Sequence, residues 1–227
     1  MTLAPQNTLI FDWNSTLLDD AQALCDAFNI LFAQCGREPI DLQTYQDRYD
    51  MPIERFYGNH GFAAHEIPSL LPKFAEVFHS NYEPLAKSLP LRDGAHDVLS
   101  YAKDSGAHTI ILSNHLRPPI LEHLARFSIA DYFSEVIAYP SRAEQFRKES
   151  KGQKLLRYLG ENWLDPACSV IVGDSPEETV IAREQGIVSV AITGGCVSEA
   201  RLRAAQPDYL IHSLTELKPI LAERWGG

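Results

Sequence analysis

The chain contains 227 residues, of which 45% are hydrophobic and 22% are charged, and its formal net charge is −10 at pH 7. This length and apolar content suffice for a buried core and exclude a globally disordered chain. The acidic balance excludes a broad nucleic-acid surface, because phosphate backbones are bound by clustered Lys and Arg. The sequence shows neither a membrane-span pattern nor a signal-peptide pattern. The four cysteines lack metal-type spacing, so we expect reduced thiols and a cytoplasmic protein.

The first strong pattern along the chain is a short apolar run over residues 9–11 that ends at Asp12. The run predicts a buried strand, and hydroxyl side chains follow it at Ser15 and Thr16. In an open α/β sheet, an acid at the carboxyl end of a strand faces the crevice where ligands bind. Asp12 is therefore a candidate nucleophile or metal ligand, although an Asp in this position can simply begin a turn.

Residues 21–87 have the spacing of helices rather than strands. Apolar side chains recur at helical intervals within 24–32 and within 71–78. Shorter helices are expected over 42–49 and 52–57, where Pro and Gly interrupt the pattern. This part of the chain is therefore predicted to be a helical insert.

From about residue 89 onward, strand and helix patterns alternate. Asp93 is expected to cap one helix, and the Pro pair at 118–119 suits the first turn of another. Repeated βα units imply a parallel sheet covered by helices on both faces, which is an α/β fold. The further expected strands span 108–113, 135–138, 169–172, 188–192 and 209–211.

Two of these strands also end in polar side chains. One is followed by Ser113 and Asn114, and another by a Gly and then Asp174, with a basic stretch over 147–151 between them. Together with the Asp12 segment, these features resemble, in order, the four motifs of the haloacid dehalogenase superfamily, a group rich in aspartate-nucleophile phosphatases. The first motif is most similar to a phosphoglycolate-phosphatase-like subgroup.

This resemblance implies a Rossmann-like core over residues 1–20 and 88–227, with a helical cap over 21–87. It implies a Mg²⁺-dependent phosphatase that hydrolyses a small phosphorylated metabolite through an aspartyl-phosphate, with phosphoglycolate as the family-level expectation. We expect no nucleic-acid or membrane partner, and the sequence leaves the oligomeric state open.

The expected roles follow from the chemistry of phosphoryl transfer. A carboxylate such as Asp12 can attack phosphorus, and a divalent cation offsets its repulsion of an anionic substrate. Asp12 and Asp174 offer hard oxygen ligands that suit Mg²⁺. The resemblance adds the backbone carbonyl of Asn14 as a ligand and Ser113 as a catalytic, phosphate-binding hydroxyl. The substrate-binding candidates are Asn114, Thr16 and, in the cap, Arg55.

Two assignments stay open at this stage. Lys148 fits the family's usual separation from the Gly-Asp174 motif and is the expected catalytic lysine, with Lys151 as the alternative. Glu178 stands where the family places a second acidic residue and is expected as a metal ligand. However, residues 175–178 also have the pattern of a capping box with Pro in the first helical turn.

Asn14 departs from the family's usual Asp, the acid that protonates the leaving group. An amide cannot do this, and general acid–base help contributes roughly 10²–10⁴ in rate. Either turnover is slow, or the leaving group is good, or another group supplies the proton. His60, His65 and His115 are the available substitutes, although none has supporting spacing. Ser15 also replaces a usual Gly, which restricts the turn.

Three rival functions remain. A phosphonoacetaldehyde hydrolase also lacks the second Asp, but it needs a cap lysine for an imine. The matching segment here offers Arg55, which stays protonated. A haloacid dehalogenase typically carries Tyr at the position of Asn14. The third rival is a catalytically impaired member that binds a phosphorylated ligand.

Overall fold

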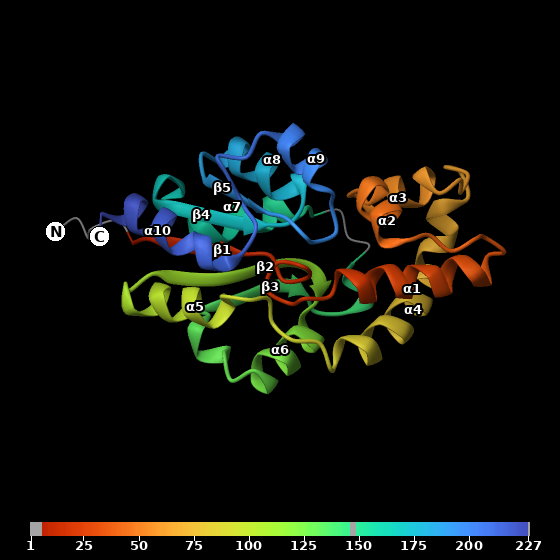
Figure 1. Ribbon diagram of the computed structural model, residues 1–227, viewed down its shortest axis with the longest axis horizontal. Helices are drawn as coiled ribbons and strands as arrows, with labels where there is room; N and C mark the ends of the chain where they lie inside the picture. The colour runs from red at the N-terminus through yellow and green to blue at the C-terminus, as the bar shows by residue number, and fades with distance from the viewer. Residues whose placement is uncertain (1–5, 146–148, 227) are drawn as a thin grey trace.

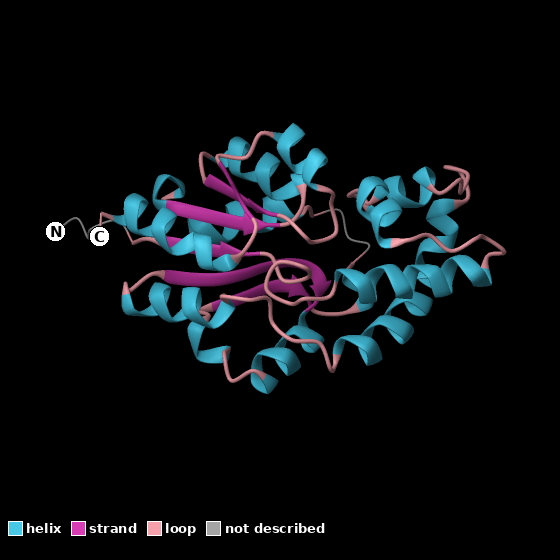
Figure 2. Cartoon of the chain, viewed as in Figure 1, coloured by secondary structure: helices cyan, strands magenta, loops and turns pink. Residues whose placement is uncertain are grey.

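The computed structural model describes residues 6–145 and 149–226, which form a parallel six-stranded sheet and the helices around it (Figures 1 and 2). The strand order is β3-β2-β1-β4-β5-β6, and every neighbouring pair is parallel. The α/β fold expected from the sequence is confirmed. The strands are β1 (Thr8–Phe11), β2 (His108–Leu116), β3 (Glu135–Tyr139), β4 (Ser169–Gly173), β5 (Val188–Ile192) and β6 (Tyr209–Ile211).

The helices fall into two groups. Four of them follow β1 directly, and the others alternate with the later strands. The first group is α1 (Ala21–Gln34), α2 (Leu42–Arg48), α3 (Ile53–Asn59) and α4 (Ile67–Ala86), which we call the helical segment. The second group is α5 (Ala95–Asp104), α6 (Arg117–Arg126), α7 (Lys151–Glu161), α8 (Pro176–Gln185), α9 (Glu199–Ala205) and α10 (Leu217–Trp225). None of the described helices is long and apolar enough to cross a bilayer.

Alternate residues of the central strand enter two hydrophobic clusters on opposite faces of the sheet. Leu9 and Phe11 belong to the larger cluster, which includes side chains of α5, α6 and α10. Ile10 belongs to the smaller cluster, with side chains of α7 and α8. This period-2 pattern explains the continuous apolar run in the sequence, because a strand covered on both faces has no solvent side.

The point where the strand order reverses lies at β1. The chain builds β1, β2 and β3 toward one edge and then returns to place β4 beside β1. Ligands bind outside the carboxyl ends of the strands at such a switch point. The helical segment lies beside this end of the sheet (Figure 1).

The helical segment packs around aromatic rings, and these rings belong to the same hydrophobic cluster as Leu9 and Phe11. Phe28 of α1 lies 4.7 Å from Phe56 of α3, centroid to centroid, and also 4.7 Å from Phe78 of α4. Aromatic pairs in these geometries add to the free energy gained from burial alone. The two chain connections to the sheet also pair with each other, because Leu18 and Leu91 form an antiparallel bridge.

One predicted helix start is wrong. The N-cap of α5 is Gly94, not Asp93, and no side chain caps this helix. Gly94 has φ +82°, and a Cβ there would lie 2.6 Å from the backbone nitrogen of Thr215. The close approach of the neighbouring loop therefore selects Gly at the cap, which the local sequence does not reveal.

Candidate active site

The polar ends of three adjacent strands meet at the switch point. Phe11 pairs with Ile111 of β2 and with Val172 of β4 in register, so the residues that follow these positions share one edge of the sheet. The backbone amide of Asp12 donates to the carbonyl of Val172 at 2.9 Å. A cavity of about 560 Å³ opens here, lined by Asp12, Asn14, Ser113, Asn114, Asp174 and Glu178 among others.

A buried lysine joins two of these carboxylates. Lys151 is 3% exposed, and its Nζ donates to Asp12 Oδ1 at 2.6 Å and also to Glu178 Oε1. It is the first residue of α7, which Ser150 caps with a complete capping box. This cap fixes where the helix begins and hence where Lys151 points. Lys148 lies outside the described residues.

The ionisation of this cluster is set by burial and by mutual attraction. Burial raises the pKa of Asp12 well above its usual value, although Lys151 acts in the opposite direction. Burial disfavours the ammonium of Lys151, but Asp12 and Glu178 outweigh this and raise its pKa. Asp12 and Glu178 therefore share a single buried ammonium, and burial disfavours the ionised form of Asp12.

Asp174 is held by neutral donors. Thr16 Oγ1 donates to its Oδ1 at 3.2 Å, and the backbone amide of Cys196 donates to its Oδ2 at 2.6 Å. Burial, with a contribution from Glu178, raises the pKa of Asp174 to about 6. A Cβ on Gly195 would lie 2.3 Å from Asp174 Oδ2, so this loop reaches the carboxylate only because a Gly stands there. The predicted substrate residue Thr16 thus contacts Asp174, and it is not among the residues that line the cavity.

Glu178 does not complete the expected capping box. Ser175 caps α8 by accepting from the amide of Glu177, and its hydroxyl donates to Glu178 Oε2 at 2.7 Å. The other oxygen of Glu178 accepts from Lys151. One oxygen of this side chain therefore stays at the Ser175 cap while the other faces Lys151 in the site. A Cβ at Gly173 would lie 2.2 Å from Glu178 Cγ, which explains the Gly that ends β4.

Ser113 and Asn114 lie at the end of β2 as expected. Ser113 is 2% exposed, and its hydroxyl accepts from the amide of His115 at 3.1 Å rather than capping α6, whose N-cap is Leu116. Asn114 Nδ2 donates to Glu177 Oε2 at 2.7 Å. Glu177 also lines the cavity, and sequence reasoning missed it although it is adjacent to Glu178.

The amide of Asn14 is committed to a buried network. Its Nδ2 donates to Asp20 Oδ2 and to Tyr82 Oη, each at 2.7 Å, and Tyr82 donates to the same carboxylate. Ser15 has φ +56°, and its amide and hydroxyl donate to Asp20 Oδ1 at 2.6 and 2.7 Å. These bonds hold a left-handed turn that normally favours Gly, which explains how Ser is accommodated.

Arg55 is not brought to the site. It is exposed on α3, next to the buried Phe56 and Tyr57, and it does not line the cavity. The helical segment instead contributes mainly apolar and aromatic side chains to the lining. Those residues are Leu24, Phe28, Tyr45, Tyr49, Met51, Pro52, Ile53, Glu54, Tyr57, Leu71, Ala75, Phe78 and His79.

Of the three histidines considered as proton donors, one lines the cavity and two do not. His60 packs between Phe32 and Phe56 among the aromatic rings of the helical segment, and burial lowers its pKa to about 4. His65 is exposed. His115 is 7% exposed and lines the cavity, as does His79, which sequence reasoning missed.

The fold and the cavity at the switch point define an α/β protein with a buried carboxylate–lysine site, and comparison with known proteins gives the family. The profile of the haloacid dehalogenase-like hydrolases matches residues 9–192. The chain belongs to this family. The resemblance inferred from the four motifs is confirmed.

Individual relatives agree with this. A phosphoglycolate phosphatase of Synechococcus elongatus is 25% identical over 209 residues, covering 92% of this chain and 94% of the relative. One from Agrobacterium fabrum is 27% identical over 237 residues, covering 99% and 96%. The structure of a predicted phosphatase from Clostridium acetobutylicum superposes with a TM-score of 0.79 at 19% identity, covering 97% of this chain and all of that one. At that identity the structural likeness shows the fold.

Proposed function

We propose that the protein is a Mg²⁺-dependent phosphatase that hydrolyses a phosphate monoester through an aspartyl-phosphate on Asp12. The contact between Asp12 and Lys151 at the switch point carries this proposal. In this assignment Asp12 attacks phosphorus, Ser113 binds a phosphoryl oxygen, and Lys151 holds the nucleophile and pairs with the transferred group. We assign the lysine role to Lys151 because its ammonium already lies against the nucleophile.

The donor set fits a divalent cation. Three buried carboxylates, those of Asp12, Asp174 and Glu178, surround one ammonium, and Asp174 is bound only by an uncharged hydroxyl and an amide. Such a surplus of buried hard oxygens suits Mg²⁺. Asp12, Asp174 and the backbone carbonyl of Asn14 would hold the ion, with Glu178 reaching it through water. When bound, Mg²⁺ neutralises charge on the phosphoryl group.

The lining of the cavity bears on the substrate. Phosphoglycolate, which the named relatives hydrolyse, carries a carboxylate that calls for a cationic partner. Among the lining residues that the helical segment contributes there is no Lys or Arg, whereas Phe28, Tyr57 and Phe78 are aromatic. We therefore propose a monoester with a largely apolar or aromatic alcohol, and phosphoglycolate becomes the comparison substrate.

The rival chemistry of C–P hydrolysis needs a lysine free to form an imine. Among the described residues that line the cavity, the one lysine is Lys151, and two carboxylates bind it. Arg55 is exposed elsewhere. The cavity therefore favours ester hydrolysis over this alternative.

We also propose that the helical segment acts as a cap that moves over the sheet edge, with the domain boundaries expected from the sequence. The paired connections near Leu18 and Leu91 support this, because both chain crossings lie together like a hinge. Closure would exclude water and complete the site. Solution scattering with and without vanadate and Mg²⁺ checks this; identical profiles contradict it.

The function is tested with a panel of phosphate esters in Mg²⁺ and in excess EDTA. We expect turnover only with the metal, and Asp12→Asn should lower it by more than about 10³-fold because the nucleophile is lost. Asp19→Asn is the matched control, since Asp19 is exposed beside the same turn. Trapping of a phosphoenzyme in the wild type supports the aspartyl-phosphate. Retention of turnover by folded Asp12→Asn contradicts the proposal.

A further inference from the structure

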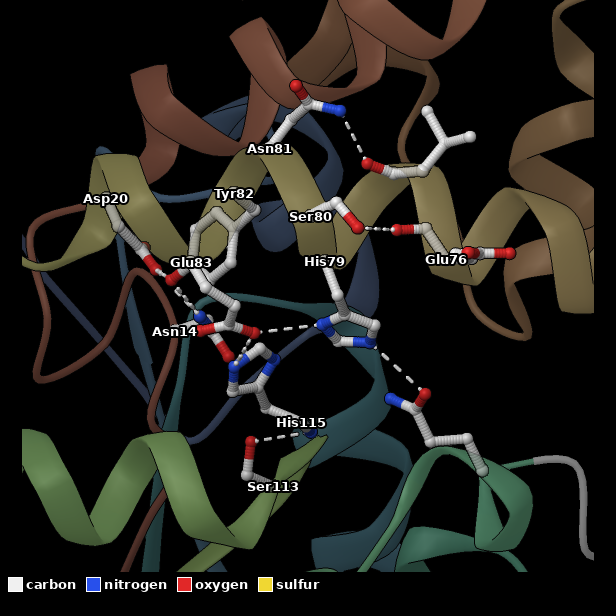
Figure 3. A network of polar contacts seen from close by, with 12 residues as sticks. Asn14, Asp20, Glu76, His79, Ser80, Asn81, Tyr82, Glu83, Ser113 and His115 are labelled. Carbon is white, nitrogen blue, oxygen red and sulfur yellow. Dashed lines mark hydrogen bonds and ion pairs between the residues drawn. The ribbon is translucent and has the colours of Figure 1, made fainter.

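A cluster of two imidazoles and one carboxylate joins the helical segment to the sheet beside the proposed site (Figure 3). Glu83 Oε1 lies 2.9 Å from His79 Nδ1 and 3.1 Å from His115 Nε2. His79 and Glu83 stand one turn apart on α4, and His115 is at the end of β2. The proposed function leaves this cluster unused, and Asn14 leaves the reaction without a proton donor.

The carboxylate is ionised and committed to both rings. Burial alone raises the pKa of Glu83, but hydrogen bonds from His115 and His79 outweigh it and lower the pKa to about 2. A carboxylate that binds one ring nitrogen fixes the orientation of the imidazole and favours its protonated form. Glu83 is thus placed to orient the ring of His115.

The second nitrogen of His115 remains available. Nε2 faces Glu83, and the described residues provide no hydrogen-bond partner for Nδ1. By contrast, His79 is held on both sides, because its Nε2 lies 3.2 Å from Gln145 Oε1. Of the two imidazoles, only His115 therefore has a ring nitrogen free to exchange a proton with a ligand.

The position of His115 suits the proton donor that Asn14 cannot provide. It stands two residues beyond Ser113 at the end of β2, where the register with β3 shifts, and both residues line the cavity. Tyr82 links it to Asn14, because the tyrosine ring packs edge-on against His115 at 5.4 Å while its hydroxyl bonds to the Asn14 amide. His115 and Asn14 both line the cavity, together with the proposed nucleophile.

We propose that His115 is the general acid–base of this enzyme, replacing the carboxyl group that Asn14 lacks, with Glu83 as its positioning residue. This inference rests on the proposed function. In the first step, a carboxylate oxygen of Asp12 bonds to phosphorus, the bond from phosphorus to the ester oxygen breaks, and the departing alkoxide takes the proton from His115 Nδ1. In the second step, the neutral imidazole takes a proton from water as the water oxygen attacks phosphorus, which releases phosphate and restores Asp12.

The rate should depend on the position of the His115 ring and hence on its surroundings. Glu83, His79 and Tyr82 face it from α4, Ser113 from β2, and His123 of α6 lies near enough to interact electrostatically. Glu83 is the anionic member of this set at neutral pH. Removing the carboxylate should therefore loosen the hold on the His115 ring and misplace its Nδ1.

The test compares two aromatic esters that differ in their need for a proton. 2-Phenylethyl phosphate releases a poor alkoxide, whereas p-nitrophenyl phosphate releases a stable phenolate. His115→Gln should lower kcat for the first by roughly 10²–10⁴-fold and for the second by less than about 10-fold. His65→Gln, an exposed histidine of the helical segment, is the matched control and should leave both rates unchanged.

A second variant covers a failure of His115→Gln to fold, judged by near-UV circular dichroism. Glu83→Gln should lower kcat for 2-phenylethyl phosphate by about 10-fold or more, with little change for p-nitrophenyl phosphate, because Glu83 orients the proton donor. An equal loss on both esters, or no loss on 2-phenylethyl phosphate, overturns the inference. So does recovery of the lost activity by added Zn²⁺ in Glu83→Gln, since that makes the cluster a metal site.

The phosphatase function and the role of His115 can fail independently. If the wild type hydrolyses no ester, the proposed function fails. If the wild type is active and folded His115→Gln is equally active on 2-phenylethyl phosphate, the acid assignment fails while the phosphatase stands.

Discussion

The edge of the sheet and the helical segment line the same cavity with different kinds of side chains. The sheet and its following helices supply Asp12, Asp174, Glu178 and Lys151, all buried and mutually bonded or held by backbone amides. The helical segment supplies aromatic and aliphatic side chains, with His79 and Glu54 as the charged or ionisable exceptions besides tyrosines. The charged groups of the proposed reaction thus lie mainly on the sheet side of the cavity, and the apolar walls lie mainly on the side of the helical segment.

This difference shows that the sheet edge fixes the positions of charged groups, whereas the helical segment sets the volume of the cavity. Charged groups in a low-dielectric pocket must be fixed by partners, so strand ends and helix caps position them. Apolar walls need only the right volume and can vary with the ligand. We therefore expect substitutions at the sheet edge to change turnover, and substitutions among the aromatic and aliphatic side chains of the helical segment to change stability or substrate choice.

Among the variants that compare the two regions, the largest expected effect comes from the lysine. Lys151→Met should lower turnover by about 10²–10³-fold, because it removes the cation that holds the proposed nucleophile and leaves Asp12 and Glu178 facing each other. Lys148→Met tests the lysine expected from spacing and should change turnover by less than about 2-fold. Initial rates at saturating Mg²⁺ decide between them. A larger loss for Lys148→Met would reverse the assignment.

The next effect concerns the proposed metal. Asp174→Asn should raise the Mg²⁺ concentration for half-maximal activity by at least about 10-fold, since one hard anionic ligand becomes a neutral amide. The new amide can keep both neighbours, because its oxygen can accept from the Cys196 amide and its Nδ2 can donate to the Thr16 hydroxyl. The thermal midpoint measures whether the fold is retained. An unchanged Mg²⁺ titration removes Asp174 from the metal site.

A matched pair of core substitutions compares the two regions directly. Phe11→Leu and Phe56→Leu both truncate a ring with 0% exposure, one in β1 and one in the helical segment. Each should lower the free energy of unfolding by about 1–2 kcal/mol. Only Phe11→Leu should also lower kcat/KM, because it precedes Asp12. Urea unfolding and initial rates measure both, and equal kinetic losses would contradict the division of labour.

The smallest effect is a pH dependence that belongs to the helical segment. The pKa of His60 is lowered from 6.5 to about 4, mainly by burial and partly by Arg48 and Arg37. The unfolded chain therefore binds this proton first as pH falls, and stability declines between pH 6.5 and pH 4. His60→Phe should remove about 1–2 kcal/mol of this decline, a figure reduced for solvent screening. Identical slopes for variant and wild type in urea unfolding would contradict it.

The strands were predictable because their pattern is local. A parallel strand buried on both faces gives a continuous apolar run, and the polar residue that ends it marks the ligand edge. The positions of Asp12, Ser113 and Asp174 at that edge follow from this rule, whereas their expected roles came from the family resemblance. The start of α5 at Gly94 could not be predicted in this way, because it depends on the backbone at Thr215, which is distant in sequence but close in space.

The rest of the site depends on contacts that spacing does not encode. Whether a basic residue near 150 reaches Asp12 depends on where α7 begins, which the Ser150 cap decides. Arg55 shares a short helix with buried Phe56, and only the packing of that helix shows that the guanidinium points outward. The link between Glu83 and His115 joins distant parts of the chain and has no local signature.

The bonds of the Asn14 amide carry an evolutionary consequence. The amide of Asn14 donates to the carboxylate of Asp20 at 2.7 Å. Asn14→Asp alone would set two acids against each other, and such a pair shares a single proton rather than ionising twice. The double variant Asn14→Asp with Asp20→Asn moves the negative charge from position 20 to position 14. An amide at 20 can then donate to a carboxylate at 14, so one donor still faces one acceptor. Positions 14 and 20 are therefore epistatic, and a lineage gains or loses an acid at 14 most readily when position 20 changes with it.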